Sequence, residues 1–508
     1  MNANLFARLA PVLARDPDRT LLTWQGRPVG AGAMLRRAGQ MATRLAAMGV
    51  GPGDRVAVQV EKSPETVALY LGALQAGAMY LPLNTGYTLA ELDYFLGDAE
   101  PAAVVCDPAT EAGLAPLAAR IGAALATLDA EGRGSLAEAA DAAEPMTAVA
   151  ERGGDDVAAI LYTSGTTGRS KGAMLTHDNL WSNTQALIEA WGYTADDVLI
   201  HALPLFHTHG LFVALNMTLA AGARMHLLPK FDADEVLRLM PESTVLMGVP
   251  TFYSRLLTHP GLTREAVAGM RLFVSGSAPL MAETHRAFTE RTGHAILERY
   301  GMTETGMNIS NPLEGERRPG AVGLPLPGVE ARITDDDGRP LPPGAVGNVE
   351  IRGPNVFKGY WRMPEKTAAE FRPDGWFVTG DLGTMGEDGY FTIVGRSKDL
   401  IISGGYNVYP KEVEDVLNAL PGIAESAVIG VPHPDFGEAV VAVVVPEAGA
   451  DTVALEAAVR DATRESLAAY KRPKRVLARE AFPRNTMGKV QKNLLREEHS
   501  GLFADGSG

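Results

Sequence analysis

The chain of 508 residues contains a single cysteine, Cys106. An intrachain disulfide is therefore excluded, and so is a metal cluster held by several thiolates. The thiol lies in the apolar run "AAVVCD" (102–107), which predicts a buried strand. We expect Cys106 to be a core residue without chemistry of its own.

The sequence also lacks long apolar runs and a basic excess. No run reaches the roughly 18–20 apolar residues of a membrane span. Residues 1–20 lack the apolar stretch and cleavage site of a signal peptide and predict a first helix. The formal net charge is −15, whereas a general nucleic-acid-binding protein needs a basic face. We expect a cytoplasmic protein with no membrane and no nucleic-acid partner.

Short apolar runs alternate with helical spacing through the first part of the sequence. Residues 63–78, "SPETVALYLGALQAGA", have apolar residues at helical spacing behind a Ser-Pro start. Strand candidates are 54–60, 102–107, 157–163, 243–250 and 270–278. This alternation predicts an α/β fold whose large N-terminal domain contains helix-covered mixed or parallel sheets. Ligands of such folds bind at the carboxyl ends of the strands.

The pattern changes after Gly320. Asp-Asp-Gly and Pro-Pro-Gly turns separate strand-like runs in 329–353, which predicts a small antiparallel subdomain. A charged, glycine-bearing joint then leads to a helix and two strands, "ESAVIGVP" and "AVVAVVVPE", and the tail from Asp451 is expected to be helical. Because the chain is too long for one core, we place an N-terminal domain at 1–395 and a small α+β C-terminal domain at 396–508.

The segment "YTSGTTGRSKG" (162–172) directly follows a strand candidate and offers little to a core. Its glycines allow backbone N–H groups to converge in a nest that binds an anion. Its hydroxyl side chains add donors, and its two cations suit a polyphosphate. The residues concerned are Ser164, Gly165, Thr166, Thr167, Gly168, Arg169, Lys171 and Gly172. The segment indicates a loop for nucleotide phosphates.

This segment is neither a Walker A loop nor the G-x-G-x-x-G fingerprint of dinucleotide-binding folds, because the required spacings are missing. A flexible surface loop is the alternative interpretation of its glycines and threonines. A second polar cluster, "YKRPKR" (470–475), leaves two interpretations open. It is either a solvated face or a contact for an anionic small molecule.

The full string resembles the phosphate loop of the adenylate-forming superfamily, which includes acyl-CoA synthetases, peptide-synthetase adenylation domains and beetle luciferases. Matches continue in the family's order through "YGMTET" (300–305), "GYWRMPEKT" (359–367), "GWFVTGDLG" (375–383), "GRSKDLIISGGYNVYPKEVE" (395–414) and "PRNTMGK" (483–489). The resemblance covers nearly the whole chain and implies ATP, Mg²⁺ and coenzyme A. A carboxylate and MgATP would give an acyl-adenylate and pyrophosphate, and a thiol would then take the acyl group.

Negative charge crowds the first half-reaction, so its catalysis is mostly positioning and charge neutralisation. Lys489 resembles the family's catalytic lysine. Glu304 resembles the Mg²⁺ ligand, with Thr303 beside it, although Glu304 as a helix cap is the alternative. His207 is a further catalytic candidate. If the charge of Lys489 is required, a lysine acetyltransferase acting on it would silence adenylation and a deacetylase would restore it.

The resemblance also implies the remaining ATP contacts. Asp381 in "TGDLG" suits the two ribose hydroxyls, and Arg396 resembles its partner. Adenine needs a flat slot near 277–279 and 298–300, with Tyr300 as a plain core aromatic being the alternative. The implied ATP-binding residues are Thr163, Ser164, Gly165, Thr166, Thr167, Gly168, Lys171, Ser277, Ala278, Glu298, Tyr300, Gly301, Thr303, Asp381, Arg396 and Lys489.

The joint "GRSKD" (395–399) resembles the family's hinge, with Lys398 as the hinge residue. Motion about it would deliver Lys489 for the first half-reaction and "SGGYN" (403–407) for the second. The residues implied to bind CoA are Gly404, Gly405 and Tyr406. Glycines permit close approach of a pantetheine arm, and an ordinary turn is the alternative.

The acid pocket of the family lies near "PLFHTHGL" (204–211), "SGSAPL" (275–280) and the residues around Tyr300 and Glu304. An arginine here is hard to explain for an apolar acid, whereas a second carboxylate would satisfy it bidentately. The candidate acid-binding residues are His207, Thr208, Arg299, Met307 and Arg286, with Arg317 in reserve. We expect Arg299 to anchor the distal carboxylate, with pairing to Glu298 or Glu304 as the alternative.

The strings "ERYGMTET", "LPLFHTHGL" and "GVPTFYSRLL" resemble malonyl-CoA synthetases, which also accept methylmalonate. The resemblance therefore implies an AMP-forming ligase that joins a short dicarboxylic acid to CoA. Two alternatives stay open: a ligase for another short or aryl acid, and a stand-alone adenylation enzyme that loads a carrier protein.

Overall fold

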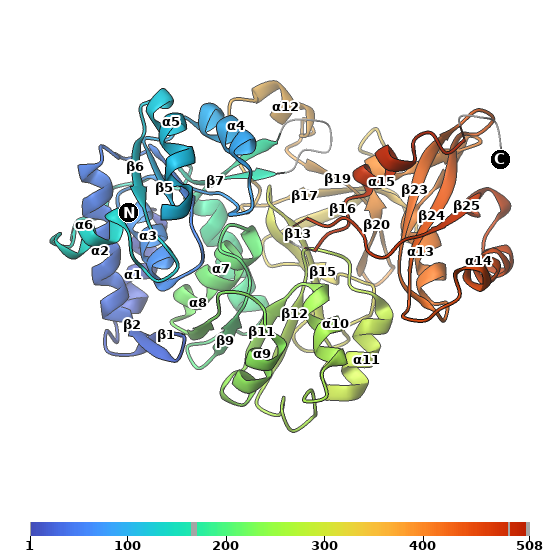
Figure 1. Cartoon of the computed structure of the whole chain (residues 1–508), viewed down its shortest axis with the longest axis horizontal. Coiled ribbons are helices and arrows are strands. Elements are labelled where there is room, and N and C mark those ends of the chain that lie inside the picture. Colours follow the sequence, from blue (N-terminus) through green and yellow to red (C-terminus); the bar gives the residue numbers. More distant parts are fainter. Residues whose placement is uncertain (1, 164–169, 486–487, 504–508) are drawn as a thin grey trace. The chain divides into compact units, whose positions relative to one another are not determined.

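The computed structural model describes residues 2–163, 170–485 and 488–503 (Figure 1). The chain forms two compact units. The first contains residues 1–330 and 351–377, and the second contains residues 331–350 and 378–508. This division reflects packing and not motion, so the sequence-based boundary between 395 and 396 for a mobile domain stays a prediction.

Two mixed sheets form the first unit. The nine-stranded sheet has the spatial order β15 (Leu324–Pro325), β14 (Gly306–Ser310), β13 (Leu297–Met302), β12 (Leu272–Ser275), β11 (Val245–Gly248), β9 (Val198–His201), β10 (Arg224–Leu227), β1 (Thr20–Trp24) and β2 (Arg27–Gly30). The seven-stranded sheet has the order β18 (Gly359–Tyr360), β8 (Lys171–Thr176), β7 (Val157–Thr163), β4 (Met79–Pro82), β3 (Arg55–Gln59), β5 (Ala103–Cys106) and β6 (Ala124–Thr127). Parallel pairs fill the centre of each sheet; antiparallel pairs lie at both edges of the nine-stranded sheet and at the β18 edge of the seven-stranded one, whose other edge is the parallel pair β5–β6.

Helices separate the parallel strands, as the alternating pattern predicted. Those of the first unit are α1 (Leu5–Leu13), α2 (Ala31–Ala47), α3 (Pro64–Gln75), α4 (Leu89–Ala99), α5 (Glu111–Ile121), α6 (Ser135–Asp141), α7 (His177–Ala190), α8 (Asn216–Ala221), α9 (Ala233–Leu239), α10 (Pro250–Thr258), α11 (Ala282–Thr292) and α12 (Pro364–Ala369). Helix α3 begins where the Ser-Pro signal placed it, because the Ser63 hydroxyl accepts the N–H of Thr66 and Pro64 occupies the first turn.

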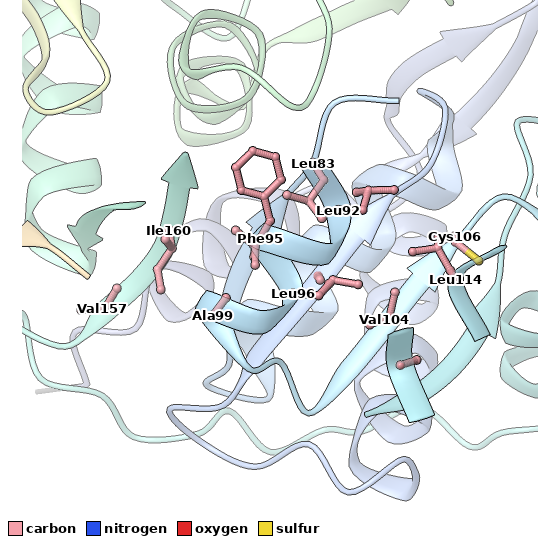
Figure 2. Packing of buried hydrophobic residues seen from close by; sticks show 13 residues of the cluster. Leu83, Leu92, Phe95, Leu96, Ala99, Val104, Cys106, Leu114, Val157 and Ile160 are labelled. Atoms are coloured by element: carbon pink, nitrogen blue, oxygen red, sulfur yellow. The ribbon is translucent and has the colours of Figure 1, made fainter. Parts of the chain in front are cut away.

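The core beside α4 shows why the apolar runs fold in this way. Figure 2 shows Leu92, Phe95 and Leu96 of α4 packed with Val104 and Cys106 of β5. Strand β5 is buried along its whole length, as expected for a parallel strand with both faces covered. Cys106 is thus the core residue that the sequence predicted. None of the described helices is long and apolar enough to cross a membrane.

Two further sheets form the second unit. The four-stranded sheet has the order β16 (Glu330–Thr334), β17 (Gly347–Arg352), β19 (Phe377–Met385) and β20 (Phe391–Arg396), and it is the small sheet predicted after Gly320. The other sheet contains β22 (Tyr406–Val408), β21 (Ile401–Ser403), β24 (Gly437–Pro446), β23 (Ile423–His433) and β25 (Arg475–Ala478). Its helices are α13 (Pro410–Asn418), α14 (Thr452–Ser466) and α15 (Lys492–His499).

The long strands β23 and β24 are buried on both faces. Val428, Val440 and Ala442 pack with α13 and α14, whereas Ile429 and Val441 belong to a second core that includes Leu495 of α15. The period-two alternation of strand side chains therefore explains the continuous apolar runs. The expectation of a wholly helical tail was wrong, because β25 pairs in parallel with β24.

Candidate active site

The predicted phosphate loop connects β7 to β8, and helix α4 holds both of its ends. Tyr162 donates its phenol hydrogen to Asp98 at 2.5 Å, and Tyr94 donates to the carbonyl of Ser170 at 2.7 Å. Thr163 is the last residue of β7 and Lys171 is the first residue of β8. The two are paired with each other in the antiparallel ladder of these strands. The other predicted loop residues lie outside the described residues: Ser164, Gly165, Thr166, Thr167, Gly168 and Arg169.

Lys171 belongs to a charged cluster that the sequence did not indicate. Its Nζ lies 3.0 Å from Glu370 Oε1, which Lys366 also contacts at 3.0 Å, and 4.0 Å from the ring centroid of Tyr360. The Tyr360 hydroxyl lies 2.6 Å from Glu370 and 2.9 Å from Glu304. One phenol thus bridges the carboxylate that holds the loop lysine and the carboxylate predicted to bind the metal.

Glu304 is buried in the turn between β13 and β14, directly after Thr303. The described residues contain no group of three or more His, Cys, Asp or Glu side chains that could cage a metal ion. Mg²⁺ keeps several waters and is commonly held by one or two carboxylates together with substrate phosphates. A single buried carboxylate therefore fits an ion that arrives with ATP, and the role of Glu304 stays a prediction.

The predicted adenine-binding residues lie on two neighbouring parallel strands or directly after them. Ser277 follows β12 and has a φ of +71°, in the left-handed region that few non-glycine residues adopt. Its hydroxyl lies 3.2 Å from His209 Nδ1, which fixes this corner of the site. The set gathered at this edge is Ser277, Ala278, Glu298, Tyr300, Gly301 and Thr303.

Asp381 and Arg396 face each other in the second unit, across strands β19 and β20. Arg396 Nε lies 2.8 Å from Asp381 Oδ1, and the carboxylate is nearly inaccessible to solvent. The structure therefore brings together the two residues that the motifs assigned to the ribose. Their contact with ribose stays a prediction.

Arg299 is buried in β13, with only 5% of its surface exposed. Its Nε and Nη2 atoms have no hydrogen-bond partner among the described residues. Burial lowers the pKa of its guanidinium to about 9, and Tyr253 opposes this shift. Of the two alternative partners, Glu298 accepts from the N–H of Gly320 and Glu304 contacts Tyr360, and the unpaired Nε and Nη2 atoms contact neither of them.

Two histidines lie close enough to Arg299 to sense its charge. Burial, followed by the charge of Arg299, lowers the pKa of His207 to about 4 and that of His209 well below its usual value. Both rings are therefore neutral near pH 7. His207 Nδ1 accepts the N–H of His209 at 3.3 Å. Three more buried polar atoms have no partner among the described residues: Thr208 Oγ1, His209 Nε2 and Ser275 Oγ.

The other candidates for the acid pocket differ in their burial and in the hydrogen bonds that they already make. Met307 is buried, and the side chain of Asn183 holds both its N–H and its carbonyl. Arg286 is exposed on α11. Arg317 donates to three backbone carbonyls at 2.7–3.2 Å, so its guanidinium already serves the fold. Of the three arginines considered for the distal carboxylate, Arg299 is the buried one with unused donors.

Lys489 lies in the second unit beside residues assigned to ATP and the hinge. Its N–H donates to Asn485 Oδ1 at 2.9 Å, and its carbonyl accepts from the N–H of Asn485. The side chain keeps access to solvent, yet the loss of hydration around its ammonium lowers its pKa to about 8. Arg396 lowers it further, while Asp381 and Asp399 oppose that shift.

This pKa predicts a pH limit for the first half-reaction. If the ammonium of Lys489 neutralises charge, adenylation requires the protonated form, which is lost as the pH rises through about 8. The single-turnover rate of pyrophosphate release should therefore fall above pH 8. A Lys489→Arg variant, which stays charged, should be slower but lack this limb. An alkaline limb of the same position in both proteins would contradict the assignment.

The hinge and CoA candidates also lie in the second unit. Lys398 is exposed in the short turn Ser397–Asp399 between β20 and β21, and Asp399 pairs with Arg496 of α15. Gly404 and Gly405 have φ values of +59° and +80°, which favour glycine. The four assignments, one to the hinge and three to CoA, stay predictions. The last of them is exposed Tyr406, which stacks on Tyr470 with ring centroids 4.7 Å apart.

Family models match both parts of the chain. The model described as AMP-binding enzyme matches residues 9–361, and the model described as AMP-binding enzyme C-terminal domain matches residues 412–489. The chain therefore belongs to the AMP-binding enzyme family. With its fold, this makes it an adenylate-forming acyl-CoA ligase that uses ATP and CoA, as the sequence predicted.

Individual relatives carry different acids in their names. The chain is 37% identical to malonate–CoA ligase of Arabidopsis thaliana over 492 residues, which covers 90% of this chain and 80% of the plant protein. It is 35% identical to long-chain-fatty-acid–CoA ligase of Bacillus subtilis (strain 168) over 541 residues, or 98% and 95% of the two chains. The crystal structure of ATP-bound MatB from Rhodopseudomonas palustris is 59% identical, with a TM-score of 0.97 and coverage of 99% and 100%.

Proposed function

We propose that this acyl-CoA ligase is a malonyl-CoA synthetase that also accepts methylmalonate. The observation that carries the proposal is Arg299, a buried cation that has two unused donors and no carboxylate partner within the described part of the chain. Burying an unpaired charge costs several kcal/mol unless a ligand compensates it. A second carboxylate on the substrate would accept both donors in the bidentate geometry that arginine favours. The malonate–CoA ligase relative supports the same acid.

The surroundings of Arg299 suit a short dicarboxylate better than an apolar acid. His207 and His209 are neutral, so each ring can donate one hydrogen bond without adding charge. Thr208 offers an unpaired hydroxyl. Met307 would limit the space beside the α-carbon, where methylmalonate has its methyl group.

In the first half-reaction a substrate carboxylate oxygen attacks the α-phosphorus, and the bond to pyrophosphate breaks. In the second, the CoA sulfur attacks the acyl carbon and AMP leaves. We assign neutralisation of the reacting carboxylate and α-phosphate to Lys489, and the phosphates to Lys171. Glu304 would hold the Mg²⁺ that accompanies ATP and screens its phosphates.

The acid assignment is tested by measuring pyrophosphate release across a panel of acids with CoA. Malonate and methylmalonate should give the highest kcat/KM, above acetate, propionate, butyrate and benzoate. Acetate outperforming malonate would overturn the dicarboxylate assignment while leaving the ligase intact. Replacing CoA with a carrier protein separates the remaining alternative, because a stand-alone adenylation enzyme would acylate the carrier in preference to CoA.

Two further expectations accompany this proposal. Acetylation of Lys489 would remove the charge that the first half-reaction needs, so a protein acetylated homogeneously at Lys489 should release no pyrophosphate. Full activity of that sample would refute a regulatory role for a lysine acetyltransferase. The cytoplasmic location stays a prediction.

A further inference from the structure

Lys62 is a buried cation outside the site described so far. It follows β3, precedes α3 and has only 5% of its surface exposed. Its Nζ contacts the carbonyl of His201 at 2.7 Å, the carbonyl of Leu203 at 2.8 Å and His201 Nδ1 at 2.9 Å. Burial lowers the pKa of Lys62, but the three acceptors favour the ammonium, because a neutral amine has only two hydrogens to donate.

The contact continues through the ring of His201. His201 Nε2 lies 2.9 Å from the carbonyl of Gly210, which can only accept, so Nε2 carries the hydrogen. Nδ1 of a neutral ring is then the acceptor for Lys62. Burial, and then the charge of Lys62, holds the pKa of His201 well below its usual value, which agrees with a neutral ring. One ammonium is therefore linked to backbone carbonyls at both ends of residues 201–210.

The segment closed in this way is the one that carries His207, Thr208 and His209. Its backbone folds closely on itself, because a Cβ on Gly210 would lie 2.0 Å from the carbonyl oxygen of Pro204. His209 Nδ1 contacts the hydroxyl of Ser277, and the charge of Arg299 lowers the pKa of both His207 and His209. The position of these side chains relative to Arg299 thus depends on how residues 201–210 are closed.

Packing alone does not explain a lysine here. An unbranched apolar side chain would fill the space without the cost of burying an ammonium that has no carboxylate partner among the described residues. Lysine adds three N–H donors that converge on three acceptors belonging to one short segment.

We propose that Lys62 is a positioning residue of the acid site, which acts through His201 to hold His207, Thr208 and His209 in register with Arg299. This inference rests on the proposed assignment of these residues to the acid. It predicts that Lys62 controls the use of the acid and not the binding of ATP.

The test compares Lys62→Met with Lys230→Met, a control on the exposed surface, using the acid that the wild-type protein prefers. Lys62→Met should raise the KM for that acid at least tenfold, while the Kd for ATP changes less than about twofold. Lys230→Met should match the wild-type protein. An unchanged acid KM, or an equal loss of acid and ATP affinity, would show that Lys62 serves only packing.

Variants of His201 decide the question if Lys62→Met does not fold. His201→Gln retains a side-chain acceptor and an N–H donor, whereas His201→Leu has neither. The glutamine variant should keep the acid KM within a few-fold of wild type, and the leucine variant should raise it at least tenfold. Equal KM values would overturn the inference. A preferred acid other than malonate, with the same pattern among the variants, would refute only the assignment of malonate.

Discussion

Replacing Arg299 with methionine is expected to lower kcat/KM for malonate by about 10²–10⁴-fold while leaving the Kd for ATP unchanged. Each hydrogen bond to a charged group contributes about 1.5–3 kcal/mol, and each 1.4 kcal/mol is a factor of ten. Two of the guanidinium nitrogens have no partner among the residues that the structure describes, so the variant would remove both contacts with the substrate at once. Pyrophosphate release with malonate and with butyrate measures the effect, and butyrate, which has no distal carboxylate, should lose far less.

The melting temperature of Arg299→Met shows whether Arg299 binds the substrate or stabilises the fold. Arg299 forms no ion pair with the described residues, so an apolar side chain of similar length removes a buried charge without stranding a partner among them. We expect the melting temperature of Arg299→Met to stay equal or rise. A collapse in stability would mean that Arg299 supports the fold. Arg286→Met tests the competing anchor, and a specific loss of malonate activity there would move the distal carboxylate to α11.

The elements of the fold were predictable where local chemistry determines them. Helix α3 starts at a Ser-Pro cap, and β3, β5 and β7 coincide with short apolar runs. Strand β25 was missed, because "RVLA" is short, lies in a charged tail and pairs in parallel with the distant β24. Its strand character comes from the sheet it joins and not from its own sequence.

The candidate site likewise contains residues that the sequence could predict and contacts that it could not. Glycines, hydroxyls and the motif residues Asp381 and Arg396 could be found because each carries a chemical requirement in its own short string. The contacts of Lys171 with Glu370 and of Lys62 with His201 could not, because they join residues 199 and 139 positions apart. Such contacts depend on the order of strands in the sheets. Tyr360 lies in a quoted motif, yet its bridging position follows only from the pairing of β18 with β8.

Replacing Lys489 with alanine is expected to abolish most of the first half-reaction and spare the second. Removing one group that stabilises developing charge typically lowers the rate by about 10²–10³-fold. Pyrophosphate release in a single turnover should fall by that factor. Formation of malonyl-CoA from supplied malonyl-AMP should stay within a few-fold of wild type, because the sulfur attacks the acyl carbon and no bond to phosphorus is made or broken in that step. Lys411→Ala, which removes a surface ion pair with Asp415, is the matched control.

The comparison of the two steps carries more information than either rate alone. A general loss of stability would slow both steps equally, whereas a lysine needed only for adenylation slows one. Equal loss in both would refute the assignment of Lys489 to a single half-reaction, and with it the reason for a hinge at Lys398. If only adenylation is lost, Gly404 and Gly405 remain the candidates for the thioester step. Their backbone conformation favours glycine. An alanine at Gly404 should then slow transfer to CoA without affecting pyrophosphate release, since the two half-reactions would draw on different parts of the second unit.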